Sequence, residues 1–282
     1  MIRSLLYVPA NAERFVAKAH ERDADAIILD LEDAVVPGEK ARARTCLATA
    51  VPAVARNGAT VFVRINSTAD TMMADAEAAC RAGAFGLFVP KTREAQALLA
   101  LASHLDRIER QLGRPQMRLV PMIEDPGAVF EARAIGIATP RIFALVAGGE
   151  DLATAMGAEP TPEVLRLPKL MVHLAAKAAG ILSFGLLRTV ADYRALDDIA
   201  RAAREARDFG FDGASCVHPS VVPILNAAFA PAPEQIEQAT RLIAAAEAAM
   251  AKGQGAFVFD GRMVDEPVVA RARALLARQR PS

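Results

Sequence analysis

The sequence predicts an α/β fold, a (β/α)8 TIM barrel with a helix–hairpin–helix extension at its carboxyl end. Short apolar segments alternate with alanine-rich helical segments along most of the 282 residues. The apolar segments are nearly continuous, which is typical of parallel strands covered on both faces. One barrel of this kind accommodates about 250 residues. A doubly wound open sheet is the alternative, because periodicity alone does not distinguish the two architectures.

Eight segments have the length and composition of buried strands. They are Ser4–Val8, Ala26–Leu31, Thr60–Ile65, Gly86–Val89, Arg118–Ile123, Ile142–Ala147, Ile181–Leu186 and Gly213–Val217. The clearest helical patterns between them are Ala12–Asp23, Glu39–Val51, Arg93–Gln111, Pro162–Ala179 and Tyr193–Asp208. Because helices follow strands repeatedly, we expect a parallel sheet that closes on itself.

The barrel domain is expected to span residues 1–230, with Pro231-Ala232-Pro233 as a joint. The extension, residues 231–282, is too small to form the core of a free domain. We expect it to pack on the barrel or on an adjacent subunit.

Within the extension, a helix at Glu234–Lys252 and a last helix to about Gln279 flank the segment GAFVFDGRMVDEP. The pair Asp260-Gly261 favours a type I′ turn. Residues 257–264 are therefore predicted to form a tight β-hairpin.

Composition excludes several classes of protein. The 33 basic and 33 acidic residues balance, and 53% of residues are hydrophobic, so disorder is not expected. No segment concentrates positive charge, which argues against nucleic-acid binding. The longest apolar segment, Ala178–Leu187, is too short to span a bilayer, and the apolar start ends at Asn11, before a signal peptide would be complete. The three cysteines are widely spaced, so a reducing cytoplasm is expected.

Chemically useful residues directly follow the predicted strands. In a barrel the carboxyl ends of all strands share one face, where the active sites of such folds lie. We therefore expect the active site on this face. The segments are Asp30-Leu31-Glu32-Asp33, Arg64-Ile65-Asn66, Pro90-Lys91, Glu124-Asp125, Gly148-Gly149-Glu150-Asp151 and His218-Pro219.

Glu124 and Asp151 follow consecutive strands, so their carboxylates are expected to reach a common point. Two carboxylates without His or Cys suit a hard cation such as Mg²⁺. The alternative is that these acids only cap the following helices, and Asp151 can do both. Gly148 and Gly149 permit a bend that brings backbone amides close to a ligand, although the chain contains no phosphate-loop motif.

Arg64 ends an apolar strand, where a guanidinium group requires an anionic partner. Its partner is either a substrate carboxylate, gripped at two points, or one of the nearby acids Asp30, Glu32 and Asp33. The sequence favours neither. His218 has no second histidine or cysteine near it, so a zinc site is not expected.

Asp265 precedes Glu266, Pro267 and a predicted helix, so an N-cap is the simplest interpretation of its role. It also follows the predicted hairpin, which could bring it over the mouth of a barrel.

Several motifs occur in a fixed order between about residues 3 and 275. They are RSLLYVPA, AIILDLEDAV followed by Lys40 and Arg42, VRIN, VPK, MIED, AGGEDL, GFDGASCVHP and DGRMVDEPVV. Together they resemble the citrate lyase β-subunit-like family, which includes malyl-CoA and citramalyl-CoA lyases. The resemblance implies a TIM barrel, commonly trimeric, that uses Mg²⁺ and takes an acyl-CoA or a 2-oxo acid as substrate.

The resemblance also implies roles for individual residues. Glu124 and Asp151 match the metal carboxylates of the family, and Arg64 matches the arginine that binds the substrate carboxylate. Asp265 matches the catalytic aspartate that an adjacent subunit contributes to the active site.

Glu32 and Asp33 match a motif near the same pocket, where they would orient Arg64 or metal-bound waters. Gly148, Gly149 and the turn through Glu150 would lie against the 2-oxo acid.

The expected reaction is reversible carbon–carbon cleavage of a 3-hydroxyacyl-CoA into an acyl-CoA and a 2-oxo acid. A thioesterase that hydrolyses a malyl-CoA-type substrate is one alternative. A CoA-independent 2-oxo acid aldolase is another, favoured by the segment ILSFGLL, where the family usually has Ile-Asp and a polar loop. A non-catalytic subunit of a larger lyase complex is the third, but such a scaffold gains nothing from clustered like charges.

Overall fold

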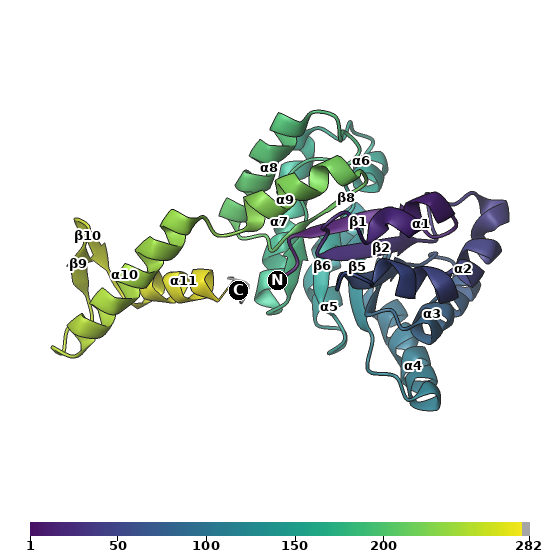
Figure 1. Cartoon of the computed structure of the whole chain (residues 1–282), viewed down its shortest axis with the longest axis horizontal. Helices are drawn as coiled ribbons and strands as arrows, with labels where there is room; N and C mark the ends of the chain where they lie inside the picture. Colours follow the sequence, from purple (N-terminus) through teal and green to yellow (C-terminus); the bar gives the residue numbers. More distant parts are fainter. Residues whose placement is uncertain (278–282) are drawn as a thin grey trace. The chain divides into compact units, whose positions relative to one another are not determined.

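The computed structural model describes residues 1–277, and the chain divides into two compact units. One unit comprises residues 2–227, and the other begins at Ala228. Figure 1 shows the strands and helices of both units. No helix within residues 1–277 is long and apolar enough to cross a membrane.

The first unit contains an eight-stranded sheet whose neighbouring strands are parallel. A parallel bridge between Phe184 and Gly213 brings the two ends of the sheet together. The (β/α)8 barrel predicted from the sequence is therefore confirmed. In the order β7-β6-β5-β4-β3-β2-β1-β8, the strands are β1 (Ser4–Pro9), β2 (Ala26–Asp30), β3 (Thr60–Arg64), β4 (Gly86–Val89), β5 (Arg118–Ile123), β6 (Ala144–Ala147), β7 (Leu182–Phe184) and β8 (Ala214–Cys216).

Helices surround the sheet, and α2, α3 and α4 pack side by side (Figure 1). Two helix starts are capped by side chains: Asp125 and Thr161 accept backbone N–H groups ahead of first-turn prolines. The helices are α1 (Glu13–Ala19), η1 (Pro37–Glu39), α2 (Lys40–Val54), α3 (Ala69–Ala82), α4 (Ala95–Leu112), α5 (Pro126–Gly136), α6 (Gly149–Met156), α7 (Pro162–Ala178), α8 (Leu196–Phe209), η2 (Pro219–Val221) and α9 (Val222–Phe229).

The barrel interior is apolar below its mouth. Phe62 packs edge-to-face against Phe88, with ring centroids 5.3 Å apart. Gly86 allows β4 to lie close to β5 and to Phe62, because a Cβ there would lie 2.5 Å from the carbonyl oxygen of Arg118 and 3.1 Å from Phe62. The buried interior residues are Leu5, Ala26, Ile28, Phe62, Phe88, Val120, Met122, Ala144, Val146 and Phe184.

The strand alternation positions the polar residues. On β3, Arg64 follows the inward-facing Phe62 by two residues, and Asp30 pairs with Arg64 in register. Glu124 follows the inward-facing Met122 in the same way. Because side chains of a strand alternate with period two, all three polar groups lie at the mouth, directly above the apolar interior.

Strand β7 is shorter than the predicted Ile181–Leu186. Gly185 has φ of 152°, outside the β region, and so the strand ends at Phe184. Similarly, Ile142 forms only an isolated bridge with Leu119, and β6 begins at Ala144.

The second unit contains α10 (Pro233–Met250), β9 (Phe257–Phe259), β10 (Arg262–Val264) and α11 (Glu266–Leu276). Strands β9 and β10 are antiparallel, and Asp260 and Gly261 have φ of 48° and 74°. These values confirm the predicted type I′ hairpin. The predicted end of the last helix, at about Gln279, lies outside the described residues.

Candidate active site

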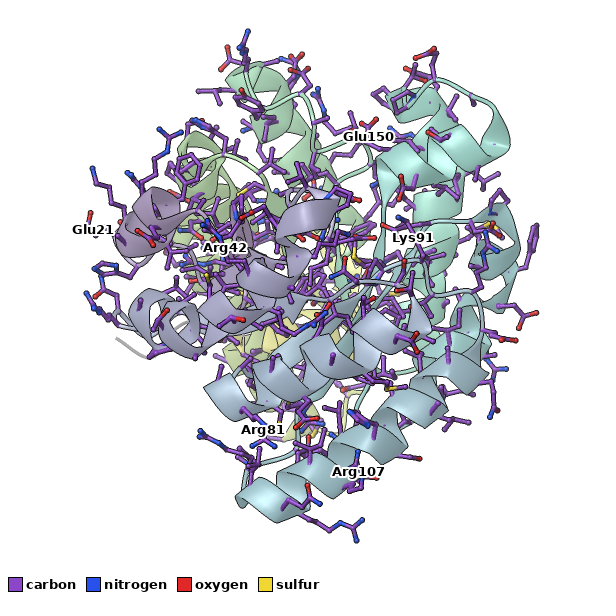
Figure 2. All side chains as sticks on the ribbon, turned by 90° about the vertical axis from the view of Figure 1, so that its right-hand side faces the viewer. Glu21, Arg42, Arg81, Lys91, Arg107 and Glu150 are labelled. Atoms are coloured by element: carbon purple, nitrogen blue, oxygen red, sulfur yellow. The ribbon has the colours of Figure 1, made fainter. Side chains whose placement is uncertain are left out.

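The carboxyl ends of the strands bring charged side chains together at the barrel mouth. Lys91 follows β4 and Glu150 lies in the first turn of α6, so both come directly after strand ends; both are labelled in Figure 2. This is the face on which the sequence predicts the active site.

Arg64 is held by acids from the segment that follows β2. Its Nε and one terminal nitrogen donate to the two carboxylate oxygens of Asp30, at 2.7 and 2.6 Å. The other terminal nitrogen lies 3.2 Å from Glu32 and 3.1 Å from Asp33. The sequence left two partners open for Arg64, a substrate carboxylate or the nearby acids. The structure shows the contacts with the acids, and contact between Arg64 and a substrate stays a prediction.

Asp30 fixes this acidic segment, a role that was not expected from the sequence. Besides binding Arg64, its carboxylate accepts the backbone N–H groups of Glu32, at 2.9 Å, and Ala34, at 3.2 Å. Asp30 is buried, and a buried carboxylate is stabilised by such bonds. Its position two residues after the inward-facing Ile28 was the available signal.

Lys91 joins several acids of the mouth. Its backbone N–H donates to Glu124 at 2.6 Å, while its ammonium lies 3.1 Å from Glu32 and 4.0 Å from Asp151. This double role requires a left-handed backbone, with φ of 51°, which is uncommon outside glycine. The sequence motif VPK placed Lys91 at a strand end but carried no sign of this conformation.

Glu124 is the most perturbed acid of the mouth. Burial raises its pKa to about 7, the N–H of Lys91 opposes the shift, and the negative charges of Glu32 and Asp151 add to it. Burial also raises the pKa of Glu32. Buried carboxylates that repel one another are stabilised by a bound cation.

The turn between β6 and α6 leaves room for Glu124. A Cβ on Gly148 would lie 2.6 Å from Cγ of Glu124, so only glycine fits there without displacing the acid. Asp151 follows in the first turn of α6, and Glu150 accepts a hydrogen bond from the hydroxyl of Thr189.

These residues fit a hard divalent cation. Glu124 and Asp151 both face Lys91, their charges interact, and carboxylate oxygens are the ligands that Mg²⁺ prefers. Within residues 1–277, no group of three or more His, Cys, Asp or Glu side chains has the geometry of a complete metal site. Water and substrate would therefore complete the coordination of an ion held by this pair.

Asp265 belongs to the second unit. It occupies the N-cap position of α11, but its side chain makes no capping hydrogen bond. The predicted N-cap position of Asp265 is therefore confirmed without a side-chain capping bond, and the catalytic role implied by the resemblance stays a prediction.

A hollow of about 1180 Å³ adjoins the site through Tyr7. The guanidinium carbon of Arg64 lies 5.0 Å from the centre of the Tyr7 ring, and the same tyrosine lines the hollow. Basic residues of α1 and its carboxyl end, Arg14, Lys18 and Arg22, also line it.

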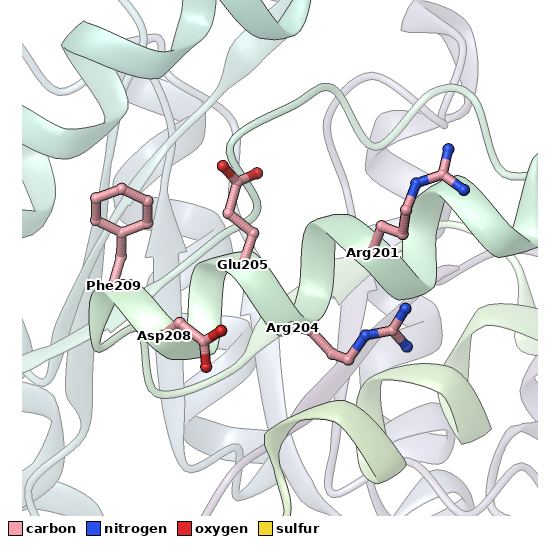
Figure 3. Close-up of a pocket in the computed structure, with 5 residues that line it drawn as sticks. All are labelled: Arg201, Arg204, Glu205, Asp208 and Phe209. Carbon is pink, nitrogen blue, oxygen red and sulfur yellow. The ribbon is translucent and has the colours of Figure 1, made fainter.

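A second hollow, of about 470 Å³, lies on the surface of α8 (Figure 3). The carboxyl end of α8 leads to the start of β8, which is the barrel end opposite the mouth. We assign it no part in the site. Its lining residues are Arg201, Arg204, Glu205, Asp208 and Phe209.

The fold and site define a barrel whose mouth combines buried acids with an arginine held by carboxylates. Residues 3–219 match the HpcH/HpaI aldolase/citrate lyase family, and the chain belongs to this family. The predictions of a citrate lyase β-like relative and of a lyase are confirmed at this level.

Individual relatives cover nearly the whole chain. A (3S)-malyl-CoA thioesterase from Cereibacter sphaeroides is 37% identical, over 98% of this chain and 94% of that protein. Citrate lyase subunit beta from Escherichia coli (strain K12) is 33% identical, over 98% and 92%. The crystal structure of protein CitE from Mycobacterium tuberculosis, in complex with magnesium, acetoacetate and coenzyme A, has a TM-score of 0.80 at 29% identity, covering 98% of this chain and 97% of that one.

Proposed function

We propose that this chain is a Mg²⁺-dependent carbon–carbon lyase. It cleaves or forms a 3-hydroxyacyl-CoA of the malyl-CoA, citramalyl-CoA or citryl-CoA type, using an acyl-CoA and a 2-oxo acid. The observation that carries the proposal is the arrangement of Glu124 and Asp151 around Lys91, beside the fixed guanidinium of Arg64. The magnesium, acetoacetate and coenzyme A bound by CitE support it.

Glu124 and Asp151 would hold the metal. When bound there, Mg²⁺ supplies a Lewis acid that polarises the oxygen of the 2-oxo acid. Gly148 keeps the space beside Glu124 open, and Gly149 and Glu150 continue the turn along the bound acid.

Arg64 would neutralise the carboxylate of the 2-oxo acid and the negative charge that develops during cleavage. Its guanidinium is preorganised, because Asp30 binds it at two points and Glu32 and Asp33 contact its remaining nitrogen. Catalysis gains from groups that need no reorganisation when charge develops.

The acyl-CoA would occupy the hollow that adjoins Tyr7. Arg14, Lys18 and Arg22 offer positive charge for its phosphate groups. Because Tyr7 lines the hollow and also lies beside Arg64, the thioester end of the acyl-CoA would lie next to the mouth.

Asp265 would exchange a proton with the enolate carbon of the acyl group. Its carboxylate makes no capping bond within its own helix. We place it in the active site of an adjacent subunit of a homotrimer, as the family resemblance implies. Asp265→Asn should then abolish turnover and leave metal binding intact.

Condensation assays test the reaction. The chain is incubated with Mg²⁺, acetyl-CoA or propionyl-CoA, and glyoxylate, pyruvate or oxaloacetate, and products are identified by mass spectrometry. A 3-hydroxyacyl-CoA that forms with one pair, and not with the Glu124→Gln variant, supports the proposal. No condensation or cleavage with any pair would refute it.

A thioesterase is the second candidate, because a (3S)-malyl-CoA thioesterase is 37% identical to this chain. Incubation with malyl-CoA separates the two reactions. Acetyl-CoA and glyoxylate are the products of a lyase, whereas malate and free CoA are the products of a thioesterase.

A further inference from the structure

Lys169, on α7, is a buried lysine that the proposed reaction does not use. It is 4% exposed and lines a narrow internal space with Ala147, Ser183, Phe184 and Phe211. It forms no ion pair within residues 1–277; burial lowers its pKa to about 8, and the negative charge of Glu150 only partly opposes this shift. A buried ammonium without a carboxylate partner destabilises a fold. We therefore expect Lys169 to have a function that offsets this loss of stability.

Lys169 lies directly beneath the turn that presents Asp151. Its ammonium donates to the carbonyl oxygen of Ala147, the last residue of β6, at 3.1 Å. A Cβ on Gly149 would lie 3.0 Å from Cδ1 of Leu165, one turn earlier on α7, and 3.4 and 3.5 Å from Cε and Nζ of Lys169. The turn is therefore packed on the lysine.

The same turn is anchored on its other side by β5. The N–H of Gly148 donates to the carbonyl oxygen of Ile123 at 3.0 Å. Two successive glycines give the backbone more freedom than any other pair of residues. The place of Asp151 relative to Glu124 thus depends on these two anchors.

We propose that Lys169 is a positioning residue: through the carbonyl of Ala147 it holds the β6–α6 turn where Asp151 can share a metal ion with Glu124, at a cost in stability. This inference rests on the proposed function, in which those two carboxylates bind Mg²⁺. Metal sites require their ligands within narrow limits of geometry, so a loosened turn weakens binding without contacting the ion.

The test measures two properties of the full chain, with Mn²⁺ as a spectroscopic probe for the Mg²⁺ site. Mn²⁺ affinity is measured by electron paramagnetic resonance, and the melting temperature is measured without metal. Lys169→Met should weaken Mn²⁺ binding by about 10–100-fold, as loss of a residue that orients a ligand does. It should raise the melting temperature by about 2–8 °C, because the unpaired buried charge is removed.

Two further variants serve as controls. Lys169→Arg retains a cationic donor and should bind Mn²⁺ as the wild type does. Lys177→Met removes a lysine from the same helix, one that is half exposed and paired with Asp212 at the opposite end of the barrel. It should lower the melting temperature and leave Mn²⁺ affinity unchanged.

Three results would overturn the inference while leaving the proposed function intact. In the first, Lys169→Met binds Mn²⁺ as the wild type does. In the second, its melting temperature falls together with its Mn²⁺ affinity, and in the third it fails to fold. Either of the last two would mean that the lysine only supports the barrel. Failure of the proposed metal site is distinguishable, because the wild type would then bind no Mn²⁺, or Glu124→Gln would bind it unchanged.

Discussion

Glu124 is a buried acid whose ionised form is disfavoured in the folded chain. Its carboxyl is buried beneath the glycine turn and bonded to the N–H of Lys91. Burial raises its pKa to about 7, so near neutral pH the folded chain holds a proton there that the unfolded chain does not. A bound metal would replace that proton.

This pKa predicts a pH-dependent effect of Glu124→Gln on the metal-free protein. A carboxyl whose pKa is raised by folding stabilises the fold below its unfolded pKa of about 4.3, and this stability is lost as the pH rises through about 7. The glutamine variant does not titrate. It should therefore gain stability relative to the wild type, by about 2–3 kcal/mol between pH 5 and pH 8.

Urea unfolding of both proteins at pH 5 and pH 8, with a chelator present, measures this gain. Effects of the substitution on packing are the same at both pH values and cancel in the comparison. A stability difference that does not change with pH would contradict the assigned pKa.

Arg64 illustrates why a side chain at the mouth needs a rigid support. Asp30 binds its guanidinium at two points and also binds the backbone of the segment that carries Glu32. Truncating Asp30 would therefore release both the cation and the acids around it. Asp30 therefore acts on the site through the groups that it holds in place.

At the scale of elements, the β6–α6 turn sets the position of Asp151 relative to Glu124, the pair that we propose to hold the metal. Gly148 allows the turn to pass close to Glu124, and Gly149 lies on Lys169. Neither glycine has a positive φ, so close packing, not backbone conformation, requires them.

Gly148→Ala should weaken metal binding more than it weakens the fold. Its Cβ would lie 2.6 Å from Cγ and 3.0 Å from the carboxyl carbon of Glu124, so the acid itself has to shift to admit it. We expect Mn²⁺ affinity to fall by about 10-fold or more while the barrel stays folded. Mn²⁺ titration and far-ultraviolet circular dichroism measure the two effects.

Gly127→Ala is a matched control. Gly127 lies in the first turn of α5, directly after the neighbouring strand, and its Cβ would approach only the side chain of Asp125, at 3.1 Å. This variant should bind Mn²⁺ normally. Equal loss of affinity in both variants would show that Glu124 is not displaced as described.

The strands and helices of the barrel could be predicted from the sequence better than the side-chain contacts at its mouth. Continuous apolar segments mark strands covered on both faces, and the pair Asp260-Gly261 marks a turn through local backbone preference alone. The contacts of Lys91 depend instead on a left-handed backbone, and those of Lys169 on two elements that lie far apart in the sequence. Neither feature produces a local pattern in the amino-acid sequence.

The acids of the mouth could be predicted as a group, because they follow strand ends. Which of them binds Arg64 could not, because that choice depends on strand register: Asp30 pairs with Arg64 across neighbouring strands, whereas Glu32 and Asp33 reach it from the following segment.

At the scale of the whole molecule, the proposed catalytic set is divided between two units of the chain. Glu124, Arg64 and Asp151 belong to the first unit and Asp265 to the second. The hairpin next to Asp265 carries Val258 and Met263, which are cross-strand partners and are each 75% exposed. Exposed apolar side chains that face one another on a small hairpin favour contact with another surface.

The proposed sharing of Asp265 between subunits predicts that two inactive variants restore activity when they form mixed oligomers. Glu124→Gln removes a metal ligand from the barrel, and Asp265→Asn removes the proton-transfer group of the second unit. A site built from the barrel of the Asp265→Asn chain and the aspartate of a Glu124→Gln neighbour has both groups intact. Random assembly of equal amounts places about a quarter of the sites in this combination.

The variants are unfolded together, refolded as a mixture and assayed against each variant refolded alone. About a quarter of the wild-type activity is expected from the mixture, and none from either variant. If Asp265 instead serves the barrel of its own chain, every chain in the mixture lacks one essential group and the mixture stays inactive. Activity from Asp265→Asn alone would remove the aspartate from the proposed mechanism, while the metal site in the barrel would be unaffected.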